Sequence, residues 1–463
     1  MLLTVIVAQI LSIASATVIS VALPDLGRDL DATGSELQWV VDAFVLVLAS
    51  LLIAGGVLGD RRGRKVAFLA GVTVFALGSL WCALAPTIEV LLAGRVLQAL
   101  GPALVLPASL AIVSEVYPDP AARARAIGLW GAGSGIGVAS GPTLGGAIVD
   151  AVGWRGVFAV NIPICLLLLV AGWKVIPHVR PARGPVRFDF AGALLLTLAV
   201  ATLAFVIIEG REAGWTSAII LAGATVCVVA TVAFARVERR HAAPLLDLAL
   251  LRHRAFVVAN VGGAGASFAF IGCIVFLSVF LQQVQGRSPG ETGLCLLPLG
   301  VATASCAPIA GRLTARLGAR TPILVGLTLA TLAMTLLTVR LEVGLGAGSL
   351  AWMLALLGAG IGLTLPAMTA TAVGSVEQAR AGMAAAVHNA CRQLGQALGV
   401  AVVGTIIFAQ AGSASDGGRR LVGADAVAWT GGLHTALALC AVLLGVALAG
   451  VALFVPRGRP SLT

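Results

Sequence analysis

Long apolar runs alternate with short polar segments along the whole chain. Because a helix needs about 20 apolar residues to cross roughly 30 Å of hydrocarbon, each long run predicts one transmembrane helix. Fourteen spans are predicted, at approximately 4–24, 38–59, 66–86, 90–113, 125–149, 155–176, 189–208, 216–235, 255–282, 291–312, 321–339, 348–372, 381–411 and 429–455. The pattern therefore predicts an all-α integral membrane protein without a sizeable soluble domain.

A charged turn between spans 2 and 3 recurs 255 residues later between spans 10 and 11. The first copy runs from Gly56 to Lys65 (GVLGDRRGRK), and the second is residues 311–320 (GRLTARLGAR). With this offset, spans 1–6 match spans 9–14, and spans 7 and 8 have no counterpart. We therefore predict two six-helix halves, at 1–178 and 255–463, around a linker and two-helix insert at 179–254. Such internal duplication is typical of transporters that bind substrate between their repeats.

Composition and charge agree with a membrane location. The chain is 59% hydrophobic and 11% charged, with a mean hydropathy of +1.03 and a pI of about 10.0. The basic residues lie in short loops rather than in one patch, so they indicate orientation in the bilayer and not nucleic-acid binding. Most of them lie on the side that also carries the C-terminal tail, which predicts that both termini are cytoplasmic.

The residue types also exclude several other classes of protein. All eight cysteines lie in or at the edge of apolar spans, without metal-site or disulfide spacing. The chain has no Gly-x-x-x-x-Gly-Lys-Ser/Thr loop for ATP, and no set of acids, histidines or nucleophiles forms a catalytic constellation. We therefore expect neither an enzyme nor an ATP-driven pump, and no metal or organic cofactor.

Four further features occur at particular places in the order of spans. They are Gly56, Asp60, Arg61, Gly63, Arg64 and Lys65 after span 2; Arg95-Val-Leu-Gln98 in span 4; Gly137, Gly141, Pro142, Gly145 and Gly146 in span 5; and Asn389-Ala-Cys-Arg392-Gln393 in span 13. Together they resemble the fourteen-span drug:proton antiporter branch of the major facilitator superfamily, and the resemblance covers nearly the whole chain. It implies a major facilitator fold that exports amphipathic drugs or antibiotics, uses the proton gradient as its energy source and requires no oligomer.

The turn after span 2 is predicted to be a cytoplasmic gate. Its glycines allow a tight turn between helices, and its charges are suited to an ion-pair latch. The second copy has Ala315 where the first has Asp60, so we expect a complete latch only in the first copy. The alternative is a basic segment that only fixes topology.

The glycine motif of span 5 is predicted to be a hinge with a smooth packing face. Gly137, Gly141 and Gly145 recur every four residues, which lets another helix approach closely, and Pro142 removes a backbone hydrogen bond. Many membrane helices pack through glycines in this way, so the spacing alone is weak support.

Asp42 is the one acidic residue that we place well inside a span, and burying a lone carboxylate there is costly. Spans 2 and 4 both run inward from the outer face, and Arg95 lies at the same depth as Asp42. We predict that Arg95 holds Asp42 ionised in one conformation and releases it in another, which couples proton entry to substrate exit. The alternative is a permanent structural ion pair, or an Asp42 that water reaches from outside.

The resemblance implies a substrate cavity lined mainly by spans 1, 4, 9 and 12. The candidates for this cavity are Thr17, Ser20, Gln98, Phe268 and Arg392. Arg392 either bonds to helix carbonyls and amides such as those of Gln282 and Gln283, or contacts an acceptor-rich substrate. His388, one turn before it, is either a titrating group or a packing residue.

Mostly small and mildly polar candidates favour neutral or weakly charged amphipathic substrates. The frequent use of arginine instead of lysine, with abundant Ala and Gly, suggests a GC-rich bacterial genome and hence a bacterial cytoplasmic membrane. The alternatives are an exporter of an endogenous metabolite or siderophore, or a membrane sensor that transports nothing.

Overall fold

The computed structural model describes residues 1–117, 119–177, 189–210, 213–240, 250, 252–376, 381–411 and 419–455. In these ranges the regular structure is helical, and no strand occurs. The elements are α1 (Leu2–Thr17), α2 (Ile19–Asp29), α3 (Gly34–Arg62), α4 (Arg64–Ala83), α5 (Ile88–Val116), α6 (Pro120–Val152), α7 (Trp154–Ala159), α8 (Asn161–Val175), α9 (Phe190–Glu209), α10 (Ala218–Arg240), α11 (Arg254–Val279), the π-helical turn η2 (Phe280–Val284), α12 (Pro289–Leu317), α13 (Arg320–Arg340), α14 (Ala347–Gly374), α15 (Ala381–Ala411) and α16 (Ala424–Phe454).

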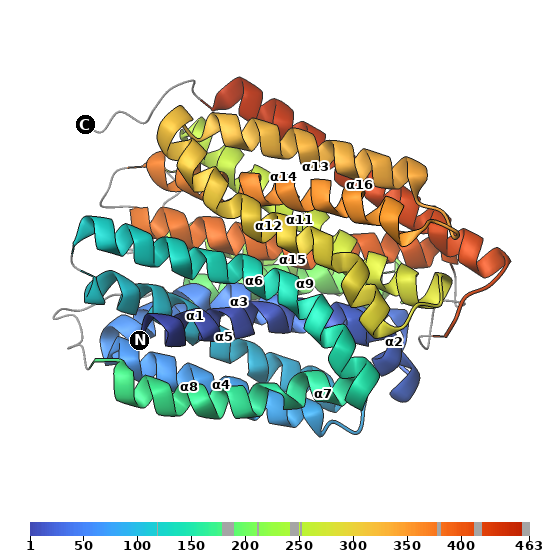
Figure 1. Cartoon of the computed structure of the whole chain (residues 1–463), viewed down its shortest axis with the longest axis horizontal. Coiled ribbons are helices and arrows are strands. Elements are labelled where there is room, and N and C mark those ends of the chain that lie inside the picture. The colour runs from blue at the N-terminus through green and yellow to red at the C-terminus, as the bar shows by residue number, and fades with distance from the viewer. Residues whose placement is uncertain are drawn as a thin grey trace.

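These helices confirm the predicted spans. Thirteen segments of the described chain are long and apolar enough to cross a membrane, and the bent pair α1 and α2 makes a fourteenth. The helices run roughly side by side along the length of the molecule (Figure 1). The all-α membrane architecture follows from the hydropathy pattern because a chain in lipid must satisfy its backbone hydrogen bonds internally.

The repeat in the sequence extends to the signals that start and stop helices. Thr33 forms a capping box with Glu36 at the start of α3, and Ser288 forms one with Glu291 at the start of α12. Each of these helices ends at a glycine with positive φ, Gly63 at 98° and Gly318 at 82°. The cap and the glycine of α12 are each displaced by 255 residues from those of α3, so the duplication includes local backbone chemistry.

The first span bends by 47° between α1 and α2. The Thr17 hydroxyl donates to the Ala14 carbonyl at 3.2 Å, and the Ser20 hydroxyl donates to the Thr17 carbonyl at 2.7 Å. Pro24, which lacks an N–H, follows inside α2. The side-chain bonds of Thr17 and Ser20 to backbone carbonyls lie at the bend and are of a kind that bends helices, whereas Pro24 lies beyond it.

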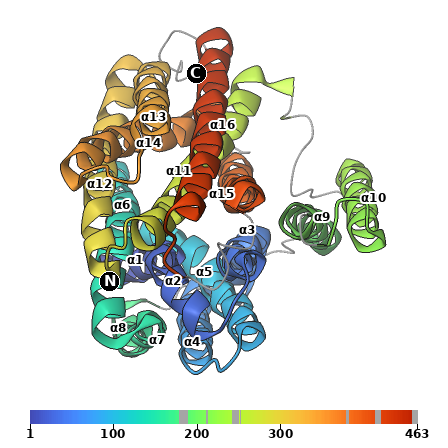
Figure 2. The same cartoon turned by 90° about the vertical axis from the view of Figure 1, so that its right-hand side faces the viewer.

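Two groups of neighbouring helices matter most for the site. α6 packs against α1 on one side and α12 on the other, and α3 packs against α5 and α15. α9 and α10 pack together at the edge of the bundle, where α9 also contacts α3 and α15 (Figure 2). The predicted boundary at 178/179 lies outside the described residues, and the division into two halves and an insert stays a prediction.

Candidate functional site

Asp42 and Arg95 lie at similar depth but do not pair. Asp42 is eight residues into α3 from Gly34, and Arg95 is seven residues into α5 from Ile88. At 1.5 Å per residue, both lie about 11 to 12 Å along their helices from the N-terminal ends. Both residues are fully buried. However, no hydrogen bond or ion pair joins them, and neither carboxylate oxygen of Asp42 has a partner among the described residues. The predicted contact is therefore not formed in this structure.

Arg95 instead belongs to a polar network between helices. Its Nε donates to the Val40 carbonyl at 2.9 Å, and one terminal nitrogen donates to Gln98 Oε1 at 2.6 Å. The Gln98 amide in turn donates to Ser79 Oγ at 2.8 Å. The guanidinium also lies 4.4 Å from the centre of the Phe44 ring, a cation–π distance. The network ties α3, α4 and α5 together.

Helical geometry explains why Asp42 is left out. Phe44 faces Arg95, and Asp42 lies two residues before it, or about 200° around the helix axis at 100° per residue. Asp42 therefore points away from α5. Gln38 lies one turn before Asp42 and on the same face, and a Cβ placed on Gly404 of α15 would collide with its amide. This face of α3 meets α15. Depth was predictable from the sequence. In this conformation Asp42 does not face Arg95, and the pair in another conformation stays a prediction.

The network also accounts for Gln98. Gln98 is fully buried, with its amide bonded to Arg95 and Ser79. Asn161 donates to the same Ser79 hydroxyl at 3.3 Å, which adds α8. The structure therefore places Gln98 within this network instead of at an open cavity.

The two cavity candidates of the first span lie at its bend. Thr17 and Ser20 are buried and bonded to backbone carbonyls. A Cβ on Gly141 of α6 would overlap the Thr17 hydroxyl, so Thr17 packs against the glycine motif. In this conformation both hydroxyls bond to carbonyls at the bend, and Thr17 also forms part of the contact between α1 and α6.

The two cavity candidates from the second predicted half are Phe268 and Arg392, and neither has, among the described residues, a side-chain hydrogen bond like those of Thr17 and Ser20. Phe268 of α11 is 8% exposed, and its backbone meets Gly399 of α15. Arg392 is partly buried, and its Nε has no partner within the described ranges. His388 is fully buried and packs on Gly263, and neither of its ring nitrogens finds a partner in those ranges.

The amide of Gln282, which the sequence offered as a partner for Arg392, is engaged elsewhere. It donates to the Val21 carbonyl of α2 at 3.0 Å and to the Ser278 hydroxyl at 3.3 Å. The Gln282 side-chain oxygen is the atom that would accept from Arg392, and no hydrogen bond joins these two residues in the described part of the structure.

At the predicted cytoplasmic gate, two cations connect the start of α4 to other helices. Arg64 donates to Glu115 at 2.8 Å and to the Ala111 carbonyl at 3.0 Å, both on α5. Lys65 donates to the Trp173 carbonyl at 2.6 Å, on α8, and its Nζ lies 5.5 Å from the Trp173 ring centre. The motif thus joins three helices at one end of the bundle.

The remaining gate residues lie at the end of α3. Gly56 packs against α5, because a Cβ at this position would lie 3.5 Å from Pro107. Arg61 is exposed. The side chain of Asp60 lies outside the described part of the structure, so the latch stays a prediction.

The glycine motif of α6 serves two partners. Added Cβ atoms on Gly137, Gly141 and Gly145 would meet Ile10, Ile13, Thr17 or Val18 of the first span. By contrast, a Cβ on Gly146 would collide with the Pro289 carbonyl of α12. The Pro142 carbonyl approaches Gly293 of α12 just as closely. The motif thus allows close approach on both sides of α6, whereas the sequence predicted one smooth face.

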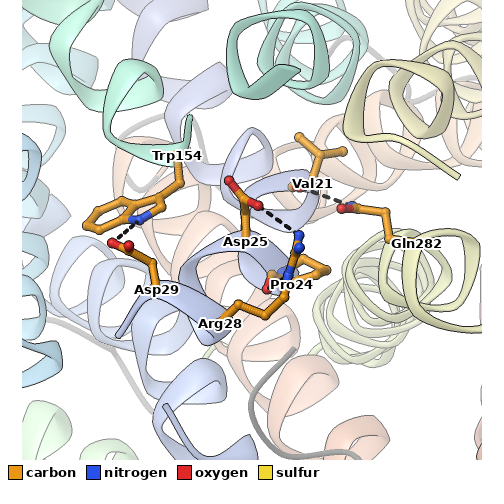
Figure 3. Close-up of polar contacts among 7 residues, drawn as sticks. All are labelled: Val21, Pro24, Asp25, Arg28, Asp29, Trp154 and Gln282. Carbon is orange, nitrogen blue, oxygen red and sulfur yellow. Dashed lines mark hydrogen bonds and ion pairs between the residues drawn. The ribbon is translucent and has the colours of Figure 1, made fainter. Parts of the chain in front are cut away.

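Residues that are far apart in the sequence contact each other near α2 (Figure 3). Gln282 of η2 donates its amide hydrogen to the Val21 carbonyl, as described above. Trp154 donates to Asp29 at 3.0 Å, and Arg28 pairs with Asp25 at 2.7 Å. The bonds of Gln282 and Trp154 hold the bent end of the first span to η2 and α7.

Asp150 makes a second long-range contact that the sequence did not suggest. Its carboxylate accepts from Ser288 Oγ at 3.0 Å and from the Gly290 N–H at 2.9 Å. Ser288 is the N-cap of α12, so the end of α6 supplies an anion to the start of another helix. The sequence contains both the acid and the helix start. It does not indicate that they pair, because 138 residues separate Asp150 from Ser288.

The comparisons with known proteins now decide the family. The family model described as "Major Facilitator Superfamily" matches residues 5–400 and 261–462. The chain belongs to the major facilitator superfamily. This membership confirms the resemblance drawn from the motifs, and it identifies a multi-pass membrane protein of a transporter family.

Several relatives in this superfamily are named for resistance to drugs. Multidrug resistance protein Stp of Mycobacterium tuberculosis is 38% identical over 401 residues, which cover 85% of this chain and 73% of the relative. The tetracenomycin C resistance and export protein of Streptomyces glaucescens is 34% identical, covering 89% and 76%. The puromycin resistance protein of Streptomyces alboniger is 36% identical, covering 88% and 81%.

A solved structure agrees on the fold. The crystal structure of a bacterial homolog of the human lysosomal transporter Spinster, in an inward-facing and occupied conformation, superposes with a TM-score of 0.71. It covers 99% of this chain and 96% of that chain at 20% identity. At this identity the likeness confirms the major facilitator fold.

Proposed function

We propose that this protein exports amphipathic drugs or antibiotics across a bacterial cytoplasmic membrane in exchange for protons. Its relatives named for drug and antibiotic resistance support the drug class. In this proposal the predicted halves rock about the site between them, and both termini lie in the cytoplasm. The motif from Gly56 to Lys65 gates the cytoplasmic side, and the glycines of α6 let helices slide closely.

Asp42 is the observation that carries the proton-coupling part of the proposal. It is fully buried in a membrane helix, and neither of its oxygens is bonded within the described chain. Such a carboxylate is costly in its charged form. A proton, water or a cation relieves that cost. We propose that Asp42 takes a proton when it is reached from outside and releases it when it is reached from inside.

Arg95 is the partner that the sequence suggested for Asp42. In this structure it donates hydrogen bonds to the Val40 carbonyl and to Gln98. Its second terminal nitrogen has no partner among the described residues. We propose that this structure is the conformation in which Arg95 has released Asp42. A rotation of α3 by about half a turn would bring the Asp42 face toward Arg95. The proposed ion pair belongs to that second conformation.

The test is gradient-driven flux in proteoliposomes. Wild-type protein is reconstituted, a proton gradient is imposed, and movement of puromycin and tetracenomycin C is followed together with lumenal pH. We expect Asp42→Asn to reduce gradient-dependent flux at least tenfold, because a neutral amide cannot carry a proton. Asp25→Asn is the matched control, because Asp25 pairs with Arg28 at the surface, and it should retain wild-type flux.

The outcomes separate the parts of the proposal. If Asp42→Asn exchanges protons for drug as well as the wild type does, Asp42 is not the proton carrier. If the wild type moves neither compound under any gradient, export of this drug class is wrong, and a narrower metabolite exporter or a sensor becomes the better interpretation.

A further inference from the structure

The helix α9 lies across one of the two largest contacts between the predicted halves. α6 packs against α12, and α3 packs against α15, so each pair joins one predicted half to the other. α9 contacts both α3 and α15, and α10 packs on the side of α9 that is away from the bundle (Figure 2). α6 and α12 lie on the opposite side of the bundle. The two-helix insert therefore covers the α3–α15 contact.

Two hydrogen bonds near one end of α9 join it to both of these helices. The Trp39 indole nitrogen of α3 donates to Glu209 Oε1 at 2.8 Å. The Thr405 hydroxyl of α15 donates to the Ile207 carbonyl at 3.0 Å. Both acceptors are in the last turn of α9, and Trp39 is in the second turn of α3. The bonds therefore lie at the end of the bundle where α3 begins, which is the outer end in the proposed orientation.

Apolar side chains fill the contact between α9 and the two helices. One buried cluster includes Val45 and Leu48 of α3, Val200, Ala204 and Ile208 of α9, and Ala397 and Ala401 of α15. The side chains where α9 meets α15 are mostly small, since Ala204 and Ala401 are fully buried there. Small side chains let helices approach closely, and they leave few large groups that would resist sliding.

The internal repeat shows what α9 replaces. Position 405 corresponds to position 150, and Asp150 bonds directly across the other contact to Ser288, the N-cap of α12. Thr405 bonds to α9 instead. Trp39, which also bonds to α9, corresponds to Leu294 of α12, which is 62% exposed. One contact between the halves is thus bonded helix to helix, whereas the other is also bonded through α9.

The two bonds of α9 differ in what their loss leaves behind. The Thr405 hydroxyl also donates to the Ala401 carbonyl of its own helix at 2.8 Å, so it keeps an acceptor when Ile207 moves away. The Trp39 indole has a single N–H, and Glu209 is its acceptor among the described residues. A donor that loses its partner without a replacement costs more free energy. The bond to α15 is therefore the one that breaks at lower cost.

We propose that α9 is a strap across the α3–α15 contact, and that it moves with α3 and releases α15 when this end of the bundle opens. The inference goes beyond the proposed function by giving the insert a role, and it rests on the alternating access in that proposal. In the closed state, the bond between Thr405 and Ile207 adds to the contacts that hold the halves together. In the open state, Thr405 keeps Ala401 alone, while the apolar face of α9 stays packed on α3.

The test measures opening of this end without a drug or a proton gradient. Val279 of α11 is 8% exposed and lines a small closed pocket with Gln38 of α3 and Gln283 of η2. Val279→Cys is introduced into the full-length chain with its eight native cysteines replaced by alanine. In lipid nanodiscs, the rate of its reaction with a membrane-impermeant maleimide reports opening. We expect Thr405→Val, which removes the hydroxyl and keeps the shape, to raise this rate about fivefold, the effect of one hydrogen bond.

Two control variants are measured in the same background. Trp39→Phe removes the bond to Glu209, and we expect the rate to change by less than about twofold, because a bond present in both states does not shift their equilibrium. Thr338→Val removes a hydroxyl that bonds to the Met334 carbonyl within α13, and it should react as the parent does. Hydrogen exchange of residues 400–411 in the protein with its native cysteines repeats the comparison without the reporter.

The outcomes separate the strap from the proposed function. The strap is overturned if Thr405→Val leaves the reaction rate and the hydrogen exchange unchanged. An increase with Trp39→Phe as large as with Thr405→Val would show that α9 does not stay with α3, and it would also overturn the proposal. If the reporter reacts in no variant, this end does not open, and alternating access fails together with the strap. The expected order of rates without any drug flux in the wild type would overturn export alone.

Discussion

The two faces of α3 differ in how completely their polar groups are bonded. On the face toward α5, Arg95 has Val40, Gln98 and the Phe44 ring as partners, and Gln98 continues to Ser79. On the face toward α15, Gln38 Oε1 and both oxygens of Asp42 have no partner in the described chain. A bonded network stabilises one arrangement, whereas unbonded groups are costly unless something else binds them. The comparison indicates that the α5 face stabilises this conformation, and it favours a functional role for the α15 face.

The bonded face should be the sensitive one for stability. Arg95→Leu would remove the Arg95 donor of the buried Gln98 oxygen and the additional donor that the Val40 carbonyl has beyond its own helix. We expect the free energy of unfolding to fall by about 3 kcal/mol, measured by denaturant titration in lipid–detergent micelles. A loss below about 1 kcal/mol would show that the network is not structural and would remove the contrast between the two faces.

Two glycines sharpen the same contrast. A Cβ on Gly78 of α4 would lie 2.5 Å from the Gln98 backbone, which cannot move without shifting α5. A Cβ on Gly404 would meet the ends of the Gln38 and Phe276 side chains and no backbone, and the flexible Gln38 side chain can shift. We therefore expect Gly78→Ala to cost about 2 kcal/mol and Gly404→Ala less than about 1 kcal/mol. Thermal unfolding of both variants beside the wild type gives the order, and the reverse order would contradict it.

Asp42→Asn should have the smallest effect on stability, although we expect it to reduce gradient-dependent flux at least tenfold. Within the described chain, no hydrogen bond or ion pair is lost with the charge in this conformation. The unfolding free energy should therefore change by no more than about 0.5 kcal/mol, and the same titration measures it. A loss similar to that of Arg95→Leu would mean that Asp42 belongs to a structural network, and that its role in transport cannot be separated from folding.

Much of the fold could be predicted because it depends on local properties of the chain. Hydropathy predicted fourteen spans, and the structure confirms them once the bent pair α1 and α2 is counted as one. The motifs predicted the superfamily, which the family model confirms. The repeat of 255 residues also reaches the capping residues Thr33 and Ser288, whose chemistry acts within a few residues of each helix start.

The candidate site was predictable only in part. Asp42 and Arg95 were identified as unusual buried charges at one depth, and both are fully buried. Their roles stay predictions, since nothing in the geometry tests transport. Gln98 was assigned to a cavity but lies in the Arg95 network. The pairings of Ser79, Asp150 and Gln282 gave no local signal, because each partner lies on another helix.

The sequence by itself determined that this chain spans a membrane and how many times it does so. It also determined the superfamily to which the chain belongs. Those properties follow from the length and polarity of each segment and from motifs read one at a time. Only the tertiary structure decided that Phe44 and not Asp42 faces Arg95, and that Gln38 and Gln283 share a pocket. A helix fixes the angle between its own side chains, but which neighbour lies at each angle is set by the packing of all the helices together.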